Sequence, residues 1–101
     1  MYGIHEIIED AIDHVNLILE DRQGTIDTHF NAERTSVLLN EVHFINVIVN
    51  ILENAIKYSP NIPKIDIFTE NVKDYLIIKI KQAIISLFLL FLFRSSLMMG
   101  K

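Results

Sequence analysis

The chain has no cysteine, no tryptophan, three glycines and two prolines among its 101 residues. Without cysteine it can form no disulfide, use no thiolate nucleophile and build no cysteine-based zinc site. Lys and Arg are also in the minority, with nine against 13 acidic residues, and they are scattered along the sequence. The formal net charge of −4 therefore argues against a nucleic-acid-binding surface.

The two ends of the sequence have contrasting compositions. The N-terminal segment has neither the basic start nor the continuous apolar stretch of a signal peptide. The C-terminal segment lacks acidic residues after Asp74, and residues 83–93 are apolar except for Ser86. A membrane-spanning helix needs roughly 20 apolar residues, so this shorter run is better explained as a buried strand or core helix. A membrane-associated tail is the weaker alternative.

Hydrophobic periodicity predicts an amphipathic helix from about Ile4 to Leu19, because its apolar residues recur at three- and four-residue steps. Gly24 is the candidate C-cap of this helix. Alternation of apolar and polar residues then predicts a strand over residues 25–31 and a short second strand over residues 36–39.

A second helix is expected over residues 41–59, with Asn40 as its N-cap and Pro60 ending it. Residues 64–70 and residues 75–81 again alternate between apolar and polar side chains. Two such segments joined by a short polar turn predict an antiparallel hairpin.

The order of these elements predicts an α+β fold. Helices that alternate with pairs of strands favour a two-layer α/β sandwich, with the helices on one face of a mixed, mainly antiparallel sheet. A length of 101 residues allows one domain with one modest core. We expect residues 1–81 to form this unit and residues 82–101 to be a divergent apolar tail.

The second predicted helix carries a polar stripe, in which Asn46, Asn50, Asn54 and Tyr58 recur every four residues. Asparagine is a poor helix former, and each one costs about half a kcal/mol relative to alanine. A solvated face or a polar contact to the sheet would explain a single asparagine, whereas a nucleotide site would explain all three. The predicted apolar face consists of Val42, Ile45, Val49, Leu52 and Ile56, with Ile48, Ile51 and Ala55 beside it.

The residue types in this stripe and next to it suit a magnesium nucleotide. Asparagine carboxamide oxygens can join the octahedral shell of magnesium beside water and phosphate oxygens. Lys57 is a mobile point charge suited to phosphate, and Tyr58 offers a flat face to a base.

The segment NVIVNILENAIKYS, residues 46–59, resembles the N-box of sensor histidine kinases, which share an ATP-binding fold with gyrase and MutL. The family pattern is close to N-x-x-x-N-L-x-x-N-A-x-K-Y/F-S/T, with Ile51 here in place of leucine. The matching residues are Asn46, Asn50, Asn54, Ala55, Lys57, Tyr58 and Ser59. The resemblance covers residues 3–81 and implies the first part of the family's ATP-binding domain.

The resemblance implies that Asn54 coordinates Mg²⁺, that Asn50 and Lys57 lie near the phosphates, and that Tyr58 lines the nucleotide pocket. ATP hydrolases of the superfamily have a glutamate four residues before the metal-binding asparagine, where this chain has Asn50. The resemblance therefore implies phosphoryl transfer to a protein histidine rather than hydrolysis. A histidine-containing dimerisation domain would supply that histidine, and a response regulator would be the partner. No residue of this chain is singled out as catalytic.

The sequence departs from the family pattern on both sides of this segment. Gln82, Ile84 and Ser86 stand where the family has D-x-G-x-G, and its lid and second glycine-rich loop are missing. We therefore expect ATP and Mg²⁺ binding to be impaired or lost, and the chain to be a truncated or frame-altered gene product. The histidines all lack the sequence context of a phosphate-accepting histidine and are expected at the surface or a sheet edge. They are His5, His14, His29 and His43.

Two functions follow from these patterns. The main hypothesis is a fragment of a two-component sensor histidine kinase, located in the cytoplasmic part of a membrane-bound parent. The alternative is a noncatalytic interaction or dimerisation module that forms a homodimer through residues 82–101. The apolar run in that segment favours such a contact, because it would otherwise promote aggregation.

Overall fold

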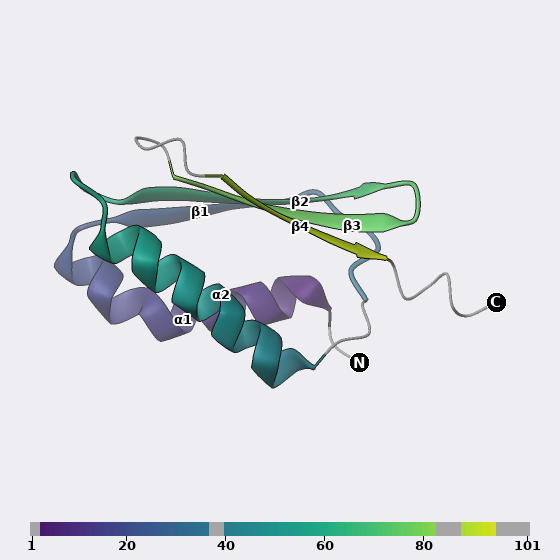
Figure 1. The fold of residues 1–101 in the computed structure, drawn as a ribbon, viewed down its shortest axis with the longest axis horizontal. Helices are drawn as coiled ribbons and strands as arrows, with labels where there is room; N and C mark the ends of the chain where they lie inside the picture. Colours follow the sequence, from purple (N-terminus) through teal and green to yellow (C-terminus); the bar gives the residue numbers. More distant parts are fainter. Residues whose placement is uncertain (1–2, 37–39, 83–87, 95–101) are drawn as a thin grey trace.

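The structure, a computed structural model, describes residues 3–36, 40–82 and 88–94, the last of these as backbone only. Two helices lie on one face of a sheet (Figure 1). The elements in chain order are α1 (Ile4–Asp21), β1 (Thr25–Phe30), α2 (Glu41–Lys57), β2 (Lys64–Val72), β3 (Tyr75–Gln82) and β4 (Phe88–Arg94).

The four strands form one sheet in the order β1-β2-β3-β4. β1 runs parallel to β2, from the Thr25–Lys64 pair to the Phe30–Thr69 pair. The β2–β3 and β3–β4 pairs are antiparallel. The expected α+β fold, with its helices on one face of a mixed, mainly antiparallel sheet, is confirmed.

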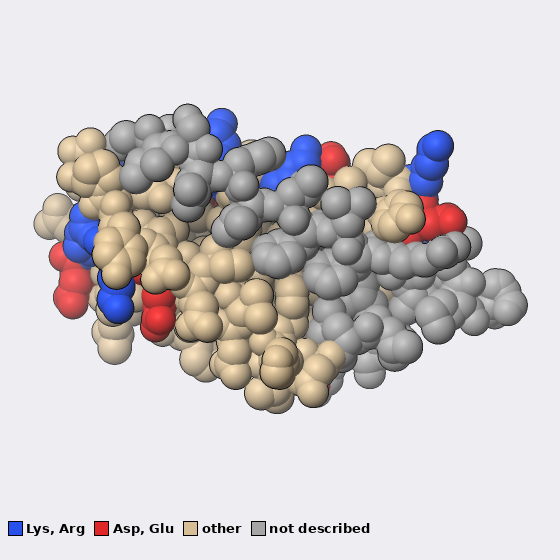
Figure 2. All heavy atoms as spheres, in the orientation of Figure 1, with Lys and Arg blue, Asp and Glu red and all other residues tan. Residues whose placement is uncertain are grey.

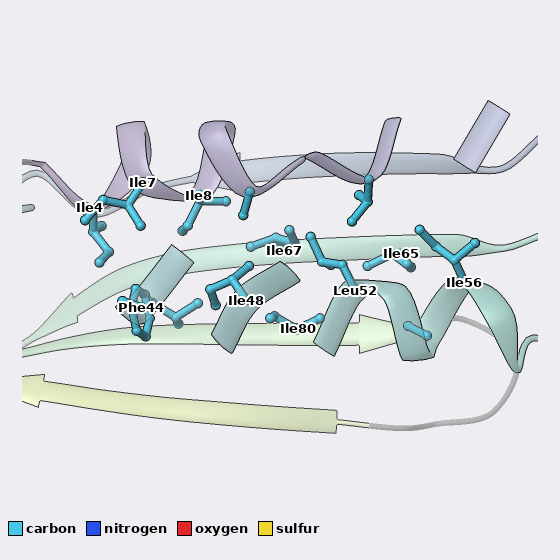
Figure 3. Close-up of a cluster of buried hydrophobic side chains, with 14 of the residues drawn as sticks. Ile4, Ile7, Ile8, Phe44, Ile48, Leu52, Ile56, Ile65, Ile67 and Ile80 are labelled. Atoms are coloured by element: carbon cyan, nitrogen blue, oxygen red, sulfur yellow. The ribbon is translucent and has the colours of Figure 1, made fainter. Parts of the chain in front are cut away.

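The core lies between the helical layer and the sheet (Figure 3). Side chains alternate along β2, so that Ile65, Ile67 and Thr69 are buried under the helices, whereas Asp66 and Phe68 lie on the outer face of the sheet. The helices contribute the other half of the core. Its main helical members are Ile4, Ile7, Ile8, Ala11 and Val15 from α1, and Phe44, Ile48, Leu52 and Ile56 from α2.

The apolar face of α2 differs from the predicted one. Val42 was expected on this face but is 68% exposed, and the buried row consists instead of Phe44, Ile48, Leu52 and Ile56. The helix has apolar residues on most of its circumference, so periodicity alone did not define the rotation that faces the sheet. Its true inner row recurs at strict four-residue steps, two residues out of phase with the asparagine stripe.

The N-terminal end of α2 agrees with the sequence-based prediction, whereas the C-terminal end differs from it. Asn40 is the N-cap, as predicted, and its Oδ1 accepts a hydrogen bond from the backbone N–H of His43 at 2.9 Å. The helix ends at Lys57 rather than at residue 59, with Tyr58 as the C-cap. The reason is that Ser59 precedes a proline, which disfavours the helical conformation at that position.

The end of α1 is closed by Gln23 rather than by Gly24. Gln23 has a φ of 57°, in the left-handed region, and its N–H donates to Glu20 O at 2.9 Å. The Gly24 N–H donates to Leu19 O at 2.9 Å, which completes a Schellman motif. Gly24 serves a different purpose, because a Cβ there would lie 2.8 Å from Leu19 Cδ1 and 2.9 Å from Pro63 O.

Two further predictions concern short segments. The turn between β2 and β3 is shorter than the predicted residues 71–74, since β2 continues to Val72 and leaves only Lys73 and Asp74 as the connection. The predicted short strand over residues 36–39 lies mostly outside the described residues. Its first residue, Ser36, forms an isolated antiparallel bridge with Gly3.

The apolar C-terminal segment contributes a strand, which was one of the two structures expected there. β4 pairs with β3 along its whole length, from Phe88 opposite Lys81 to Arg94 opposite Tyr75. Residues 83–87 and 95–101 lie outside the described part of the chain, and the division into 1–81 and 82–101 stays a prediction.

Candidate functional site: the polar stripe of α2

The polar stripe of α2 consists of Asn46, Asn50, Asn54 and Tyr58, and every one of these side chains is exposed. Residues four apart on a helix lie one above the other, with Cβ atoms about 5–6 Å apart. The stripe is therefore a row of carboxamides that ends at Tyr58, whose side chain is 73% exposed. Because the asparagines are exposed, a polar contact to the sheet does not explain them.

Lys57 lies beside the stripe and is also exposed. Within the described part of the chain, the side chains of Asn50, Asn54, Lys57 and Tyr58 make no hydrogen bond, ion pair or ring contact with other side chains. The helix carries no charged residue between Glu41 and Glu53. Figure 2 accordingly shows an uncharged surface over the middle of the helical layer. The row of amides thus leads to Lys57 at the end of α2.

The C-terminal end of α2 is held by Arg22, from the C-cap of α1. Its guanidinium donates to Ile56 O at 2.6 Å, to Ser59 O at 2.8 Å and to Asn61 O at 3.0 Å. A cation is favourable here because the last carbonyls of a helix carry its negative dipole end. The buried Ser59 adds a bond from its Oγ to Asn61 O at 2.8 Å. Sequence reasoning missed this role of Arg22, since its partners lie more than 30 residues away.

Gln82 connects the sheet to α2. It is the last residue of β3 and stands where the resembled family has the aspartate of D-x-G-x-G. Its side chain is 4% exposed, and its Nε2 donates to Ala55 O at 3.1 Å. The carboxamide therefore ties the end of β3 to the last turn of α2, at the residue that follows Asn54 in sequence.

Two pockets formed by described residues lie away from α2, and neither has a lining residue on that helix. The larger, of about 420 Å³, lies where the β2–β3 hairpin meets the segment after β1. Its lining residues are Asn31, Glu33, Arg34, Glu70, Asn71 and Lys73. The smaller, of about 230 Å³, lies on the outer face of the sheet near Phe68, Lys79 and Lys81. The described residues also contain no group of three or more His, Asp or Glu placed to hold a metal ion.

The histidines are placed largely as expected, with one exception. His14, His29 and His43 are exposed, and His29 pairs with Asp66 at 3.0 Å on the outer face of the sheet. His5 is instead partly buried between α1 and the sheet. It stacks on Phe30 and hydrogen-bonds Thr69 Oγ1 at 2.7 Å. Burial lowers the pKa of His5, an effect partly opposed by the nearby Glu9 carboxylate.

The fold and the exposed stripe define a two-layer α+β unit with a polar helix face beside the end of a central strand. Solved structures of histidine kinases share this fold. The chain matches the histidine kinase ThkA, solved in complex with the response regulator protein TrrA, at a TM-score of 0.72 and 16% identity over 80% of this chain and 24% of that one. The isolated catalytic domain of ThkA matches at a TM-score of 0.66 and 18% identity, over 81% of this chain and 57% of that chain.

A mycobacterial sensor histidine kinase, MprB, gives a similar result, with a TM-score of 0.65 and 17% identity over 80% of this chain and 52% of that chain. No protein-family model matches the sequence, and a search of curated proteins finds no match. At these identities the likeness establishes the fold. The resemblance inferred from residues 46–59 is thus confirmed as a shared fold, and the chain spans between about a quarter and somewhat over half of the chains it matches.

Proposed function

We propose that the chain is part of the ATP-binding domain of a two-component sensor histidine kinase, and that the stripe of α2 forms one wall of its Mg-ATP site. The observation that carries this proposal is the exposed row of Asn50 and Asn54, ending at Lys57 and Tyr58, on a helix of this fold. Helix-disfavouring asparagines in an exposed row serve no core packing, so a ligand is the better explanation.

The donor set of the stripe fits magnesium and phosphate. Asn54 would coordinate Mg²⁺ through its carboxamide oxygen, and Asn50 would hydrogen-bond phosphate or metal-bound water one turn earlier. Lys57 would approach the phosphates as a point charge, and Tyr58 would cover one face of the base. Bound Mg-ATP would supply the phosphoryl group and neutralise part of its charge.

The same residues favour phosphoryl transfer over hydrolysis. A hydrolase would need an acidic residue to orient water, and the stripe has Asn50 at the corresponding position. Glu53 is adjacent to Asn54 in sequence, so it projects about 100° away around the helix. The chain would therefore position ATP, while a histidine from a separate dimerisation domain accepts the phosphoryl group.

Only part of such a site is present in the sequence. Gly100 is the only glycine after Gly24, so no phosphate-covering, glycine-rich loop can be assigned within these 101 residues. Gln82 replaces the adenine-contacting carboxylate, and its Nε2 is already bonded to Ala55 O. Loss of one buried partner costs about 1–3 kcal/mol, which is roughly a 5- to 150-fold loss of affinity. We propose weak binding for this reason.

The partners and location follow from the same proposal. A neighbour in fold was solved as a histidine kinase with a response regulator, and we propose a response regulator as the downstream partner of the intact parent. We place the domain on the cytoplasmic side of a membrane-bound parent. In the described residues, neither helix is long and apolar enough to cross a membrane.

Calorimetric titration of the full chain with Mg²⁺ and a non-hydrolysable ATP analogue tests this proposal. We expect measurable binding that needs Mg²⁺ and is weaker than micromolar. Asn54→Ala should abolish it, whereas Asn46→Ala, in the same stripe two turns earlier, should change it little. Equal affinities for the wild type and Asn54→Ala would remove the stripe from the site. A sub-micromolar affinity would show that the missing segments are not needed.

A further inference from the structure

The last strand of the sheet has a backbone edge with no strand partner among the described residues. β4 pairs with β3 on one side, and the strand order places it at the end of the sheet (Figure 1). Every second residue of an antiparallel strand directs its N–H and C=O groups away from the neighbour it already has. β4 therefore offers a row of donors and acceptors to another strand.

The sequence of β4, FLLFLFR, lacks the features that normally protect such an edge. It has no proline, no lysine and no acidic residue, and its only charge is Arg94 at the end. The opposite edge of the sheet differs, because β1 carries Asp27 and His29 in its middle. Of the two edge strands in the described sheet, β4 is the one whose sequence lacks these protective residues.

We propose that two copies of this chain pair through β4, antiparallel, into one continuous sheet containing the four strands of each copy. The proposal rests on strand order and sequence, and it is independent of nucleotide binding. Antiparallel pairing of a strand with its own copy is isologous, so it closes as a two-fold dimer and uses up the open edge. The two-fold axis must be perpendicular to the sheet, which places both helical layers on the same side.

Charge favours a second copy as the occupant. In a centred antiparallel register Arg94 of each copy lies opposite Phe88 of the other, so the two arginines lie at opposite ends of the contact. β4 contains no acidic residue, so the pairing buries no carboxylate. A charged partner strand would find only Arg94 as an opposite or like charge on this edge, whereas an identical strand places no like charges opposite each other. Two apolar side chains beside the same end are exposed, since Tyr75, opposite Arg94, is 42% exposed and Val72 is 46% exposed.

Light scattering coupled to size-exclusion chromatography of the full chain, without nucleotide, tests the proposal. We expect twice the mass of one chain at high concentration and dissociation on dilution. Leu90→Glu should give a folded monomer at concentrations where the wild type is fully dimeric. Position 90 lies opposite Lys79 of β3, so the new carboxylate meets an opposite charge within its own chain. Across the dimer contact, it meets the like charge of the same substitution in the second copy.

Thr25→Glu is the matched control at the other edge, because Thr25 lies opposite Lys64 in β1–β2. This variant should remain dimeric. Circular dichroism shows whether each variant is folded. If Leu90→Glu fails to fold, hydrogen exchange of the wild type decides the question, since protection of residues 88–94 should rise with concentration while that of β1 does not.

A wild-type chain that stays monomeric at high concentration would overturn the proposal, as would a Leu90→Glu variant that remains dimeric. Open-ended aggregates would overturn it as well, because the two-fold pairing leaves no further edge on this side. Each of these results leaves the nucleotide titration unaffected, so failure of the dimer and failure of the ATP site can be told apart.

Discussion

The guanidinium of Arg22 donates a hydrogen bond to the backbone carbonyl of Ile56 at 2.6 Å and so joins the end of α1 to the last turn of α2. The same guanidinium binds two carbonyls beyond the helix, at Ser59 and Asn61. Four residues of the proposed nucleotide wall lie on this helix, and two of them, Lys57 and Tyr58, lie at the end that Arg22 holds. Arg22 thus fixes the position of the charged end of the stripe.

Replacing Arg22 with alanine should lower the free energy of unfolding by about 2–3 kcal/mol, because hydrogen bonds to charged groups contribute about 1.5–3 kcal/mol each and are not additive. Arg22→Lys should recover part of this loss, since lysine keeps the charge at the helix end but lacks the planar guanidinium, whose two terminal nitrogens bind different carbonyls. Urea unfolding measures both variants. Equal stability of Arg22→Ala and wild type would show that these bonds contribute little in solution.

The rotation of α2 can be tested with a pair of substitutions. Leu52→Ala should cost about 2–5 kcal/mol, because Leu52 is fully buried and the change leaves a cavity under the helix. Val42→Ala should change the stability by less than about 0.5 kcal/mol, since Val42 is 68% exposed. Urea unfolding at constant pH gives both values. A large effect at Val42 would favour the face inferred from periodicity over the one in the structure.

The partly buried His5 should make stability depend on pH. Burial lowers the pKa of His5 below its usual 6.5, with the Glu9 carboxylate opposing the shift. The unfolded chain therefore binds more protons at this site than the folded chain as pH falls through 6.5, so acidification destabilises the fold. The contribution of His5 to the free energy of unfolding is fully present above pH 6.5. It is lost as the pH falls from 6.5 through the lower pKa that His5 has in the folded chain.

Chemical denaturation at a series of pH values from neutral to mildly acidic measures this effect. His5→Gln should remove part of the acid sensitivity while keeping a hydrogen-bonding group near Thr69. His14→Gln, at an exposed position on the same helix, is the matched substitution for comparison. Identical pH profiles for the wild type and His5→Gln would contradict the assignment.

Much of this architecture could be predicted because its signals are local. The N-cap at Asn40, the β2–β3 hairpin and the two helices depend on neighbours in sequence, and the structure contains all of them. The N-box pattern is also local, since its residues recur on one helix. The polar stripe could therefore be predicted from the sequence alone.

The features that sequence could not supply depend on distant contacts. Which side of α2 faces the sheet is decided by packing against α1 and the strands, so Phe44 was overlooked and Val42 was wrongly included. Arg22 is bonded to carbonyls more than 30 residues away, and nothing in its own neighbourhood indicates them. Gln23 takes the left-handed position expected of Gly24 because close packing against Pro63 requires the glycine one residue later.

The most direct test of metal–nucleotide binding at α2 is nuclear magnetic resonance with Mn²⁺ in place of Mg²⁺, added together with an ATP analogue. Paramagnetic broadening should appear first in the side-chain amide signals of Asn54 and Asn50 and should be lost in Asn54→Ala. Mn²⁺ without nucleotide is the control for nonspecific broadening near exposed carboxylates such as those of α1. Broadening that is confined to α1, or that persists unchanged at α2 in Asn54→Ala, would contradict a magnesium nucleotide site on this helix.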